Sequence, residues 1–141
     1  MTAVIAVALI SFAVCVLVGM CGDVLITAQD RNMFEGDSLY FCNTISRPFG
    51  LFQYVGGFLT QYFYYPILGA AMLIALWVAS VFVGIKAFRL KGLWRWLMVV
   101  PMTCLLVSEV DLGYWVYCLN MPGYWFSQSV AYLCMLLLLW A

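Results

Sequence analysis

The side chains of this sequence best suited to chemistry are its carboxylates, because the chain contains no histidine. They form two groups, which are Asp23, Asp30, Glu35 and Asp37 after the first long apolar run, and Glu109 and Asp111 after the third. Carboxylates can take a proton from a hydroxyl group or bind a divalent cation. We therefore take Glu35, Asp37 and Glu109 as candidate catalytic residues, and Glu35 and Asp37 as candidate metal ligands. The competing interpretation is that they only solvate a polar segment.

Glu109 and Asp111 stand at the end of an apolar run. On a helix, two residues that are two positions apart point to different faces. The simplest interpretation is that both mark the boundary with water. The alternative is that Glu109 faces neighbouring helices and pairs with Arg47 or Arg31, since a carboxylate inside a membrane is costly and is often functional.

The composition is that of a chain whose main solvent is lipid. Hydrophobic residues make up 67% of the sequence and charged residues 9%, and the mean hydropathy is +1.06. A soluble domain carries about 25% charged residues. The net charge is zero, which gives no basic patch for nucleic acid. Without histidine, the commonest metal ligand and general base are missing, and we predict no cofactor.

Four apolar runs cover about residues 3–20, 66–85, 93–110 and 123–141. In lipid each must be helical to satisfy its backbone hydrogen bonds. The predicted fold is an all-α membrane domain over residues 1–141, with four transmembrane helices and one outer interfacial or re-entrant helix. The third helix should kink at Pro101. A signal peptide is the alternative for the first run, although no basic start precedes it.

The basic residues predict the orientation. The short loop KAFRLKGLWR holds four of the six Lys and Arg side chains, and short basic loops stay in the cytoplasm. Both termini are then cytoplasmic, and the polar loop of about residues 21–65 lies outside. Aromatic side chains at 62–65 would mark the outer interface, and Trp94 and Trp96 the inner one. We expect the protein in a bacterial inner membrane.

The cysteines and the small residues give further expectations. Cys42 and Cys118 both fall outside in this topology, so a disulfide between them is one pairing that it allows, with Cys21 as a competing partner. Cys15 and Cys104 lie within apolar runs and should be small core residues. Alanines at 71, 75 and 79 recur every four residues, which predicts a thin helix face where another helix docks.

The stretch RPFGLFQYVGGFLTQYFYYPILGA resembles the opening of a family of multi-pass membrane proteins of unknown role from Bacteroidota. The likeness is best over about the first 70 residues. Family members are longer, and the last run ends as MLLLLWA without a polar cap, so we expect a fragment of a longer chain. The segment FEGD, with Glu35 and Asp37, is more weakly similar to the first outer loop of polytopic glycosyltransferases. That likeness implies a lipid-linked sugar donor and a divalent cation on its phosphate.

These observations predict an integral membrane protein of the bacterial envelope whose role the sequence does not name. One alternative is the N-terminal part of a membrane glycosyltransferase that uses a lipid-linked sugar. A second alternative is a transporter component, for which broken helices and buried charge would be expected. The expected partners are the lipid bilayer and further transmembrane helices of the same or another chain, and not nucleic acid.

Overall fold

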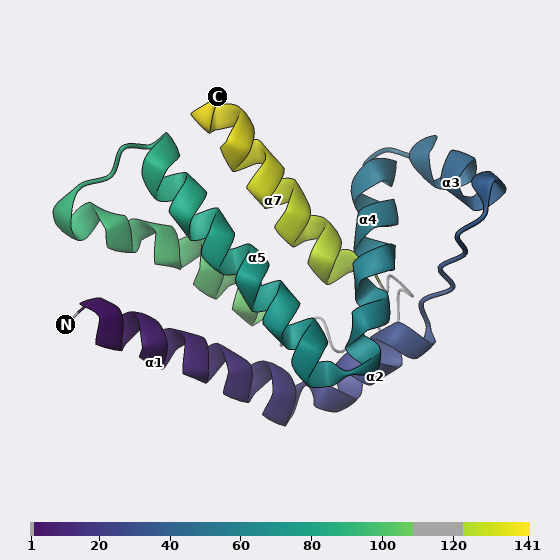
Figure 1. Ribbon diagram of the computed structural model, residues 1–141, viewed down its shortest axis with the longest axis horizontal. Helices are drawn as coiled ribbons and strands as arrows, with labels where there is room; N and C mark the ends of the chain where they lie inside the picture. Colours follow the sequence, from purple (N-terminus) through teal and green to yellow (C-terminus); the bar gives the residue numbers. More distant parts are fainter. Residues whose placement is uncertain (1, 109–122) are drawn as a thin grey trace.

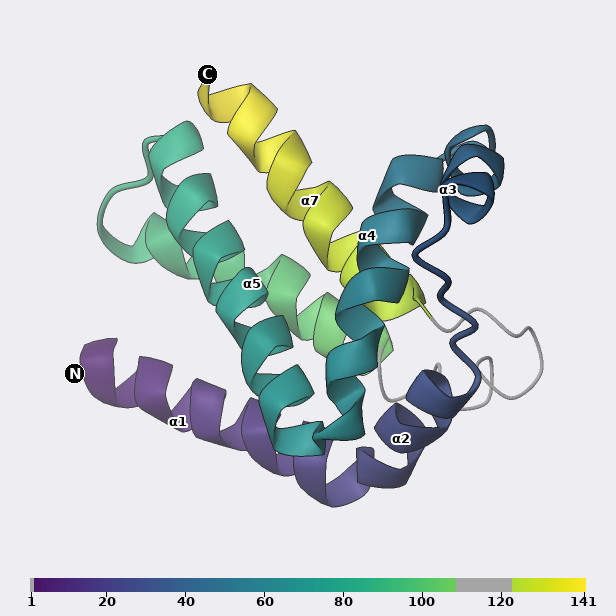
Figure 2. The same cartoon turned by 45° about the vertical axis from the view of Figure 1, so that its right-hand side comes forward.

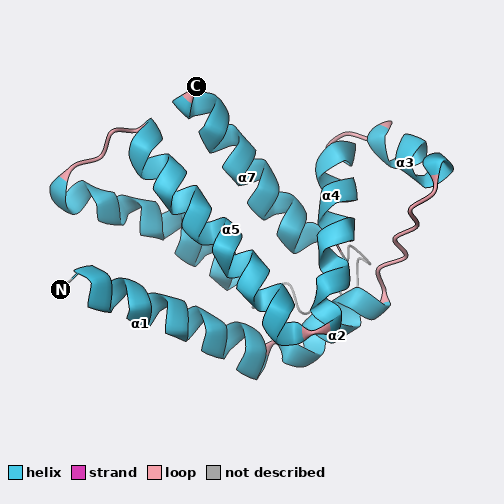
Figure 3. Ribbon diagram, in the orientation of Figure 1, coloured by secondary structure: helices cyan, strands magenta, loops and turns pink. Residues whose placement is uncertain are grey.

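The computed structural model describes residues 2–108 and 123–141, and every regular element in these ranges is helical (Figure 3). The elements are α1 (Thr2–Val14), η1 (Cys15–Met20), α2 (Gly22–Asp30), α3 (Ser38–Ile45), α4 (Gly50–Thr60), η2 (Gln61–Tyr64), α5 (Pro66–Ala87), η3 (Gly92–Met98) and α7 (Tyr124–Trp140). Residues 99–108 continue η3 as α-helix, so that the helix runs over Gly92–Ser108. The prediction of an all-α fold is confirmed.

Helix α5 is the centre of the core, and its bounds agree closely with the predicted second run. Pro66 starts the helix, where its missing N–H group has no intrahelical acceptor to lose. Trp77 is fully buried against α7, and its indole Nε1 donates a hydrogen bond to Ser129 Oγ at 2.9 Å. The ring of Phe63 packs against Phe126 with centroids 5.1 Å apart. These contacts join the middle of α5, and η2 just before it, to the N-terminal half of α7.

The packed face of α5 differs from the predicted one. Ala71 and Ala75 are exposed, so the described helices of this chain pack on another face, and the docking of a further helix on the alanines stays a prediction. The buried residues of α5 are Gly69, Ala70, Leu73, Ile74, Trp77, Ser80 and Gly84. Gly69 is needed on this face, because a Cβ atom there would lie 2.2 Å from Phe63 Cδ1. Large side chains and two glycines, and not a stripe of alanines, therefore form the helix contact.

The four predicted full-length spans are not reproduced. Among the described helices, α5 alone is long and apolar enough to cross a membrane by itself. The first run bends by 59° between Ala8–Gly19 and Gly22–Asp30, after a π-helical stretch over Cys15–Met20. Helices Gly92–Ser108 and Tyr124–Trp140 are shorter than 18 residues.

A kink of a continuous α-helix had been expected at Pro101, and the structure does not show one. The segment Gly92–Met98 is a 3-10 helix, and α-helix follows from residue 99. Pro101 is thus in the first turn of the α-helical part, where a missing N–H group removes no α-helical hydrogen bond. The change from 3-10 to α geometry, and not the proline, marks the irregularity.

The segment 21–65 was predicted to be a loop with one helix. It contains α2, α3, α4 and η2 instead. Figures 1 and 2 show its place in the molecule. The start of α1, the turn after α5 and the C-terminus lie toward one end, and α2 and η2 lie toward the other. Helices α5 and α7 run side by side in the same direction. In both views the α3–α4 junction lies between the levels of the two ends of α5.

Candidate ligand-binding site

Residues 31–60 fold into a helical hairpin that we call the α3–α4 hairpin. The segment before α3 is held to α4 by Asn32, whose Nδ2 donates a hydrogen bond to the Gly57 carbonyl oxygen at 2.6 Å. The ring of Phe34 lies 5.1 Å from that of Tyr54 and 5.8 Å from that of Phe58. Aromatic pairs at these distances stabilise by about 0.5–1.5 kcal/mol beyond burial. The hairpin is therefore fixed along its length.

The turn of the hairpin is determined by two residues. Phe49 has a left-handed backbone with φ 62°, which is uncommon for a residue other than glycine. Gly50 follows, and a Cβ atom there would lie 1.9 Å from the Thr44 carbonyl oxygen. Gly50 N donates to the Arg47 carbonyl oxygen at 2.9 Å. Only glycine fits at position 50, and this tight closure sets where Arg47 projects.

Helix α4 crosses the first turns of α7 at close range. A Cβ atom on Gly56 would lie 2.5 Å from the Gly123 carbonyl oxygen and 2.0 Å from Ser127 Oγ. Ser127 Oγ donates to the same Gly123 oxygen at 2.6 Å. Small residues allow helix backbones to approach in this way. The contact joins the C-terminal half of α4 to the start of α7, and the two helices diverge from there.

A cavity of about 1430 Å³ opens where α4 and α7 diverge. Its walls come from the α3–α4 hairpin, from helix Gly92–Ser108 and from α7. The polar lining residues are Asn32, Tyr40, Asn43, Thr44, Arg47, Gln53, Ser108, Tyr124, Ser127, Gln128 and Tyr132. The remaining lining residues are Pro48, Phe49, Phe52, Gly57, Val100, Pro101, Cys104, Leu105, Gly123 and Ala131. Ligand pockets commonly measure about 300–1,000 Å³, so this one has room for a long molecule.

The lining combines a large apolar wall with neutral hydrogen-bonding groups and one charge. Gln128 Nε2 bonds the hydroxyl oxygen of Tyr124, which orders two of the polar groups along α7. Arg47 is the one charged side chain among the described lining residues. No carboxylate is among them, so the described wall offers binding groups and no carboxylate base.

The predicted acidic candidates do not meet in this cavity. Glu35 and Asp37 are both exposed, and neither lines it. Asp37 instead precedes α3 and accepts a hydrogen bond from Ser38 N at 2.7 Å, which is the role of a helix N-cap. Within residues 2–108 and 123–141, no group of three or more His, Cys, Asp or Glu side chains is placed to hold a metal ion.

Several predicted residues fall elsewhere. Glu109, Asp111 and Cys118 lie outside the described residues, so the Cys42–Cys118 pairing and the proposed role of Glu109 stay predictions. Cys42 is exposed on α3. Cys15 and Cys104 are exposed and not core residues, contrary to expectation. Cys104 lines the cavity, which makes it a native reporter of this site.

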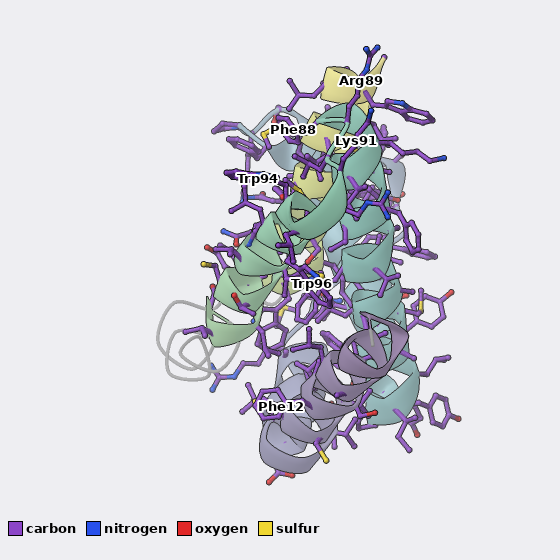
Figure 4. All side chains as sticks on the ribbon, turned by 90° about the vertical axis from the view of Figure 1, so that its left-hand side faces the viewer. Phe12, Phe88, Arg89, Lys91, Trp94 and Trp96 are labelled. Carbon is purple, nitrogen blue, oxygen red and sulfur yellow. The ribbon has the colours of Figure 1, made fainter. Side chains whose placement is uncertain are left out.

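The basic loop forms the opposite end of the molecule from α2. Figure 4 shows Phe88, Arg89, Lys91 and Trp94 gathered there, while Phe12 of α1 lies far from them. Lys86 Nζ stands 5.5 Å from the ring centroid of Trp140, a cation–π distance. Through this contact the ends of α5 and α7 meet beside the basic turn, well away from the cavity lining.

The comparisons with known proteins identify a family. The model of a family of unknown function, DUF6057, matches residues 1–141. The chain belongs to DUF6057. No curated protein and no solved structure matches this DUF6057 chain. The expectation of a family without an assigned role is thereby confirmed, while an origin in Bacteroidota and a likeness to glycosyltransferases stay predictions.

Sequence reasoning missed the residues that the DUF6057 fold brings together at the cavity. Arg47 had been considered only as a partner for Glu109, and no role had been assigned to Gln53 or Gln128. One signal was available, because a glutamine within an apolar run is expected to face other protein groups and not lipid. The two halves of the cavity lie far apart in sequence, so no spacing could have joined them.

Proposed function

We propose that this DUF6057 chain is an integral, multi-pass membrane protein that binds an amphiphilic molecule in the cavity beside the α3–α4 hairpin. The cavity itself is the observation that carries the proposal. Its lining places aromatic and aliphatic side chains such as Phe52 and Leu105 opposite amide and hydroxyl groups such as Gln128 and Ser108. A molecule with an apolar chain and a polar head complements both kinds of wall.

The outer surface supports a lipid environment. Large apolar side chains are exposed on each long helix, among them Phe12 on α1, Phe82 on α5, Val107 on Gly92–Ser108 and Leu138 on α7. Soluble monomers rarely expose extended apolar surface. Charged residues are absent from the described parts of α1, from 66–85 and from α7. The lipid bilayer is therefore the proposed partner of these surfaces.

We propose a four-span topology with both termini in the cytoplasm of a bacterium. Helix α5 has 22 residues and α7 has 17, and spans range from about 17 to 25 residues. The basic turn, the start of α1 and the end of α7 lie at one end of the molecule (Figure 1), which is what a cytoplasmic side rich in Lys and Arg requires.

In this topology the α3–α4 hairpin is re-entrant. With α5 across the bilayer, the α3–α4 junction stands between the levels of the two ends of that span (Figure 2). Irregular backbone at such depth is tolerated where it is packed in protein or lines a cavity. The turn meets the second condition, because Arg47, Pro48 and Phe49 line the cavity, while α4 of the hairpin packs on α7 at Gly56.

The topology is tested by labelling engineered cysteines in a chain whose native cysteines are replaced by serine. Gly36→Cys is tolerated, since nothing lies within 4 Å of the added Cβ atom, and Lys91→Cys is exposed in the basic turn. In intact cells a membrane-impermeant maleimide should label Gly36→Cys, and label Lys91→Cys only after permeabilisation. Equal labelling of both, or release of the protein by alkaline carbonate, would refute membrane integration in this orientation.

The cavity is tested through Cys104. In purified single-cysteine protein, dioleoyl phosphatidylcholine should slow maleimide labelling of Cys104, and chain-free glycerophosphocholine should not. The matched control is the single-cysteine chain that keeps Cys15, which is exposed on η1 and does not line the cavity. Ala131→Trp should obstruct the cavity beside α7 and abolish the lipid effect. Equal slowing at both cysteines would show general micelle binding and refute the proposed site.

The glycosyltransferase and transporter alternatives stay predictions. The described contacts favour neither, because Glu35 and Asp37 stand outside the cavity lining. Glu35→Gln and Asp37→Asn with unchanged envelope glycans would count against the enzyme. The divalent cation belongs to that alternative alone.

A further inference from the structure

Arg47 is the one charged side chain that the described cavity wall contains, and it stands in the turn of the α3–α4 hairpin. Within residues 2–108 and 123–141, no hydrogen bond or ion pair satisfies its guanidinium group. We propose that the cavity ligand is an anionic amphiphile whose phosphate or carboxylate binds Arg47. This inference rests on the proposed membrane function and names the class of ligand.

The depth of the turn gives the physical reason. The α3–α4 junction, which contains Arg47, lies between the levels of the two ends of α5 (Figures 1 and 2). A charged side chain at such a depth in a bilayer is costly, and natural proteins pair it with a counter-charge. Guanidinium groups bind phosphate and carboxylate through two parallel hydrogen bonds. An anionic head group would supply the missing counter-charge.

The surroundings of Arg47 suit a head group followed by a chain. Asn43 lies one helical turn earlier on α3, and Gln53 lies on α4, and both line the cavity. Their amide groups donate and accept hydrogen bonds, so they can bind the remaining oxygens of a head group. The apolar residues Val100 and Leu105 line the wall contributed by helix Gly92–Ser108, where an acyl chain would be buried.

The position of Arg47 does not depend on a flexible loop. Gly50 closes the turn against the Thr44 carbonyl group, and the hydrogen bond from Gly50 N to the Arg47 carbonyl oxygen measures 2.9 Å. A preorganised cationic group loses less entropy on binding than a free one. The turn therefore fixes the backbone from which the exposed Arg47 side chain extends at the cavity wall.

The experiment compares dioleoyl phosphatidylglycerol with dioleoyl phosphatidylcholine as protectants of Cys104 in the purified single-cysteine protein. The two lipids have the same chains and differ in net charge. Wild type should be half protected at about tenfold lower phosphatidylglycerol, the ratio that corresponds to about 1.4 kcal/mol. Arg47→Gln should reduce this ratio to near one. Arg47→Lys should retain part of it, because the charge remains without the planar fork.

Four controls separate the possible sources of the effect. Arg89→Gln removes a cation in the basic turn, outside the cavity lining, and should leave the ratio unchanged. Inorganic phosphate should not protect, which distinguishes an amphiphile from a free anion. Oleate, which has an acyl chain and a carboxylate head group, tests whether a carboxylate can take the place of the phosphate. Glu109→Gln tests an internal partner for Arg47, and a ratio that rises in that variant would assign the guanidinium to Glu109 and overturn the inference.

The failure of this inference differs from the failure of the proposed function. Equal protection by both lipids in wild type, abolished by Ala131→Trp, would mean a neutral amphiphile site and would overturn only the role of Arg47. If neither lipid protects Cys104 in wild type, both the role of Arg47 and the proposed amphiphile site would be overturned. The Arg47 variants should have the circular dichroism spectrum of wild type, and Arg47→Lys should retain part of the lipid preference. These two results would show that the loss of preference for phosphatidylglycerol in Arg47→Gln does not come from misfolding.

Discussion

The close contact of α4 with α7 leads to a quantitative prediction about two adjacent glycines. In Gly56→Ala the new methyl group would lie 2.5 Å from the Gly123 carbonyl oxygen and 2.8 Å from Ser127 N. Both are backbone atoms, so a rotamer change cannot relieve the clash. To reach the 3.4 Å of an ordinary contact, the Gly123 oxygen must move by about 0.9 Å, and α4 must separate from α7. Overpacking of this kind costs about 1–3 kcal/mol.

Gly57→Ala is the matched control. Its methyl group would meet the side chains of Phe34 at 3.3 Å and Asn32 at 3.5 Å, and a small rotation of the phenyl ring relieves the closer of these contacts. Both substitutions gain the same helix propensity, about 0.8–1 kcal/mol. This gain cancels in the comparison. We therefore expect Gly56→Ala to be about 1–3 kcal/mol less stable than Gly57→Ala.

The free energy of unfolding is measured by titrating dodecyl sulfate into protein in maltoside micelles and following helicity by circular dichroism. The Cys104 labelling rate is recorded in parallel, since separation of α4 from α7 should also change access to the cavity. If the two variants unfold within about 0.5 kcal/mol of each other, the usual error for independent sites, the close approach of α4 and α7 is wrong. The cavity walls would then be wrong as well.

Two further predictions concern single hydrogen bonds. Ser129→Ala leaves Trp77 Nε1 buried without the acceptor it has at 2.9 Å, which should cost about 1–3 kcal/mol; in the same dodecyl sulfate titration, Trp77→Phe combined with Ser129→Ala should cost less than the two single changes added together. Asp37→Ala removes the cap on Ser38 N and should cost about 0.5–2 kcal/mol, read as faster amide exchange in α3. Asp37→Asn keeps an acceptor oxygen, so exchange as fast as in Asp37→Ala would argue against capping.

The sequence was sufficient for α5 and insufficient for the segment before it. An uncharged run that opens at Pro66 and ends near Lys86 has only one reasonable fold in lipid, and the helix follows it closely. The α3–α4 hairpin depends instead on contacts between residues far apart, such as the bond from Asn32 to Gly57 across 25 positions. Its turn requires a left-handed Phe49, which residue preferences do not favour. Local patterns could not predict it.

The face that α5 buries within this chain could not be predicted, for a related reason. Alanines at regular spacing permit a close helix contact, but they do not require one. The helix instead buries Leu73 and Trp77, because burying large apolar and aromatic side chains is more favourable than burying methyl groups. The hydrogen bond from Trp77 to Ser129 then fixes the register of α5 against α7. The partner of Trp77 lies 52 residues away, beyond the reach of any periodicity argument.

Helix α7 explains why the cavity was hidden in an apolar run. Tyr124, Gln128 and Tyr132 are spaced four residues apart, so they form one stripe, and all three line the cavity. Ser129 faces α5 through Trp77. The N-terminal half of α7 is therefore occupied on two sides by protein and cavity, whereas Leu138 and Leu139 near its C-terminal end are exposed. Averaged hydropathy merges these two halves into one span. Exposed aliphatic residues toward one end of α7 and polar cavity residues toward the other are the division that the proposed amphiphile site in a membrane would require.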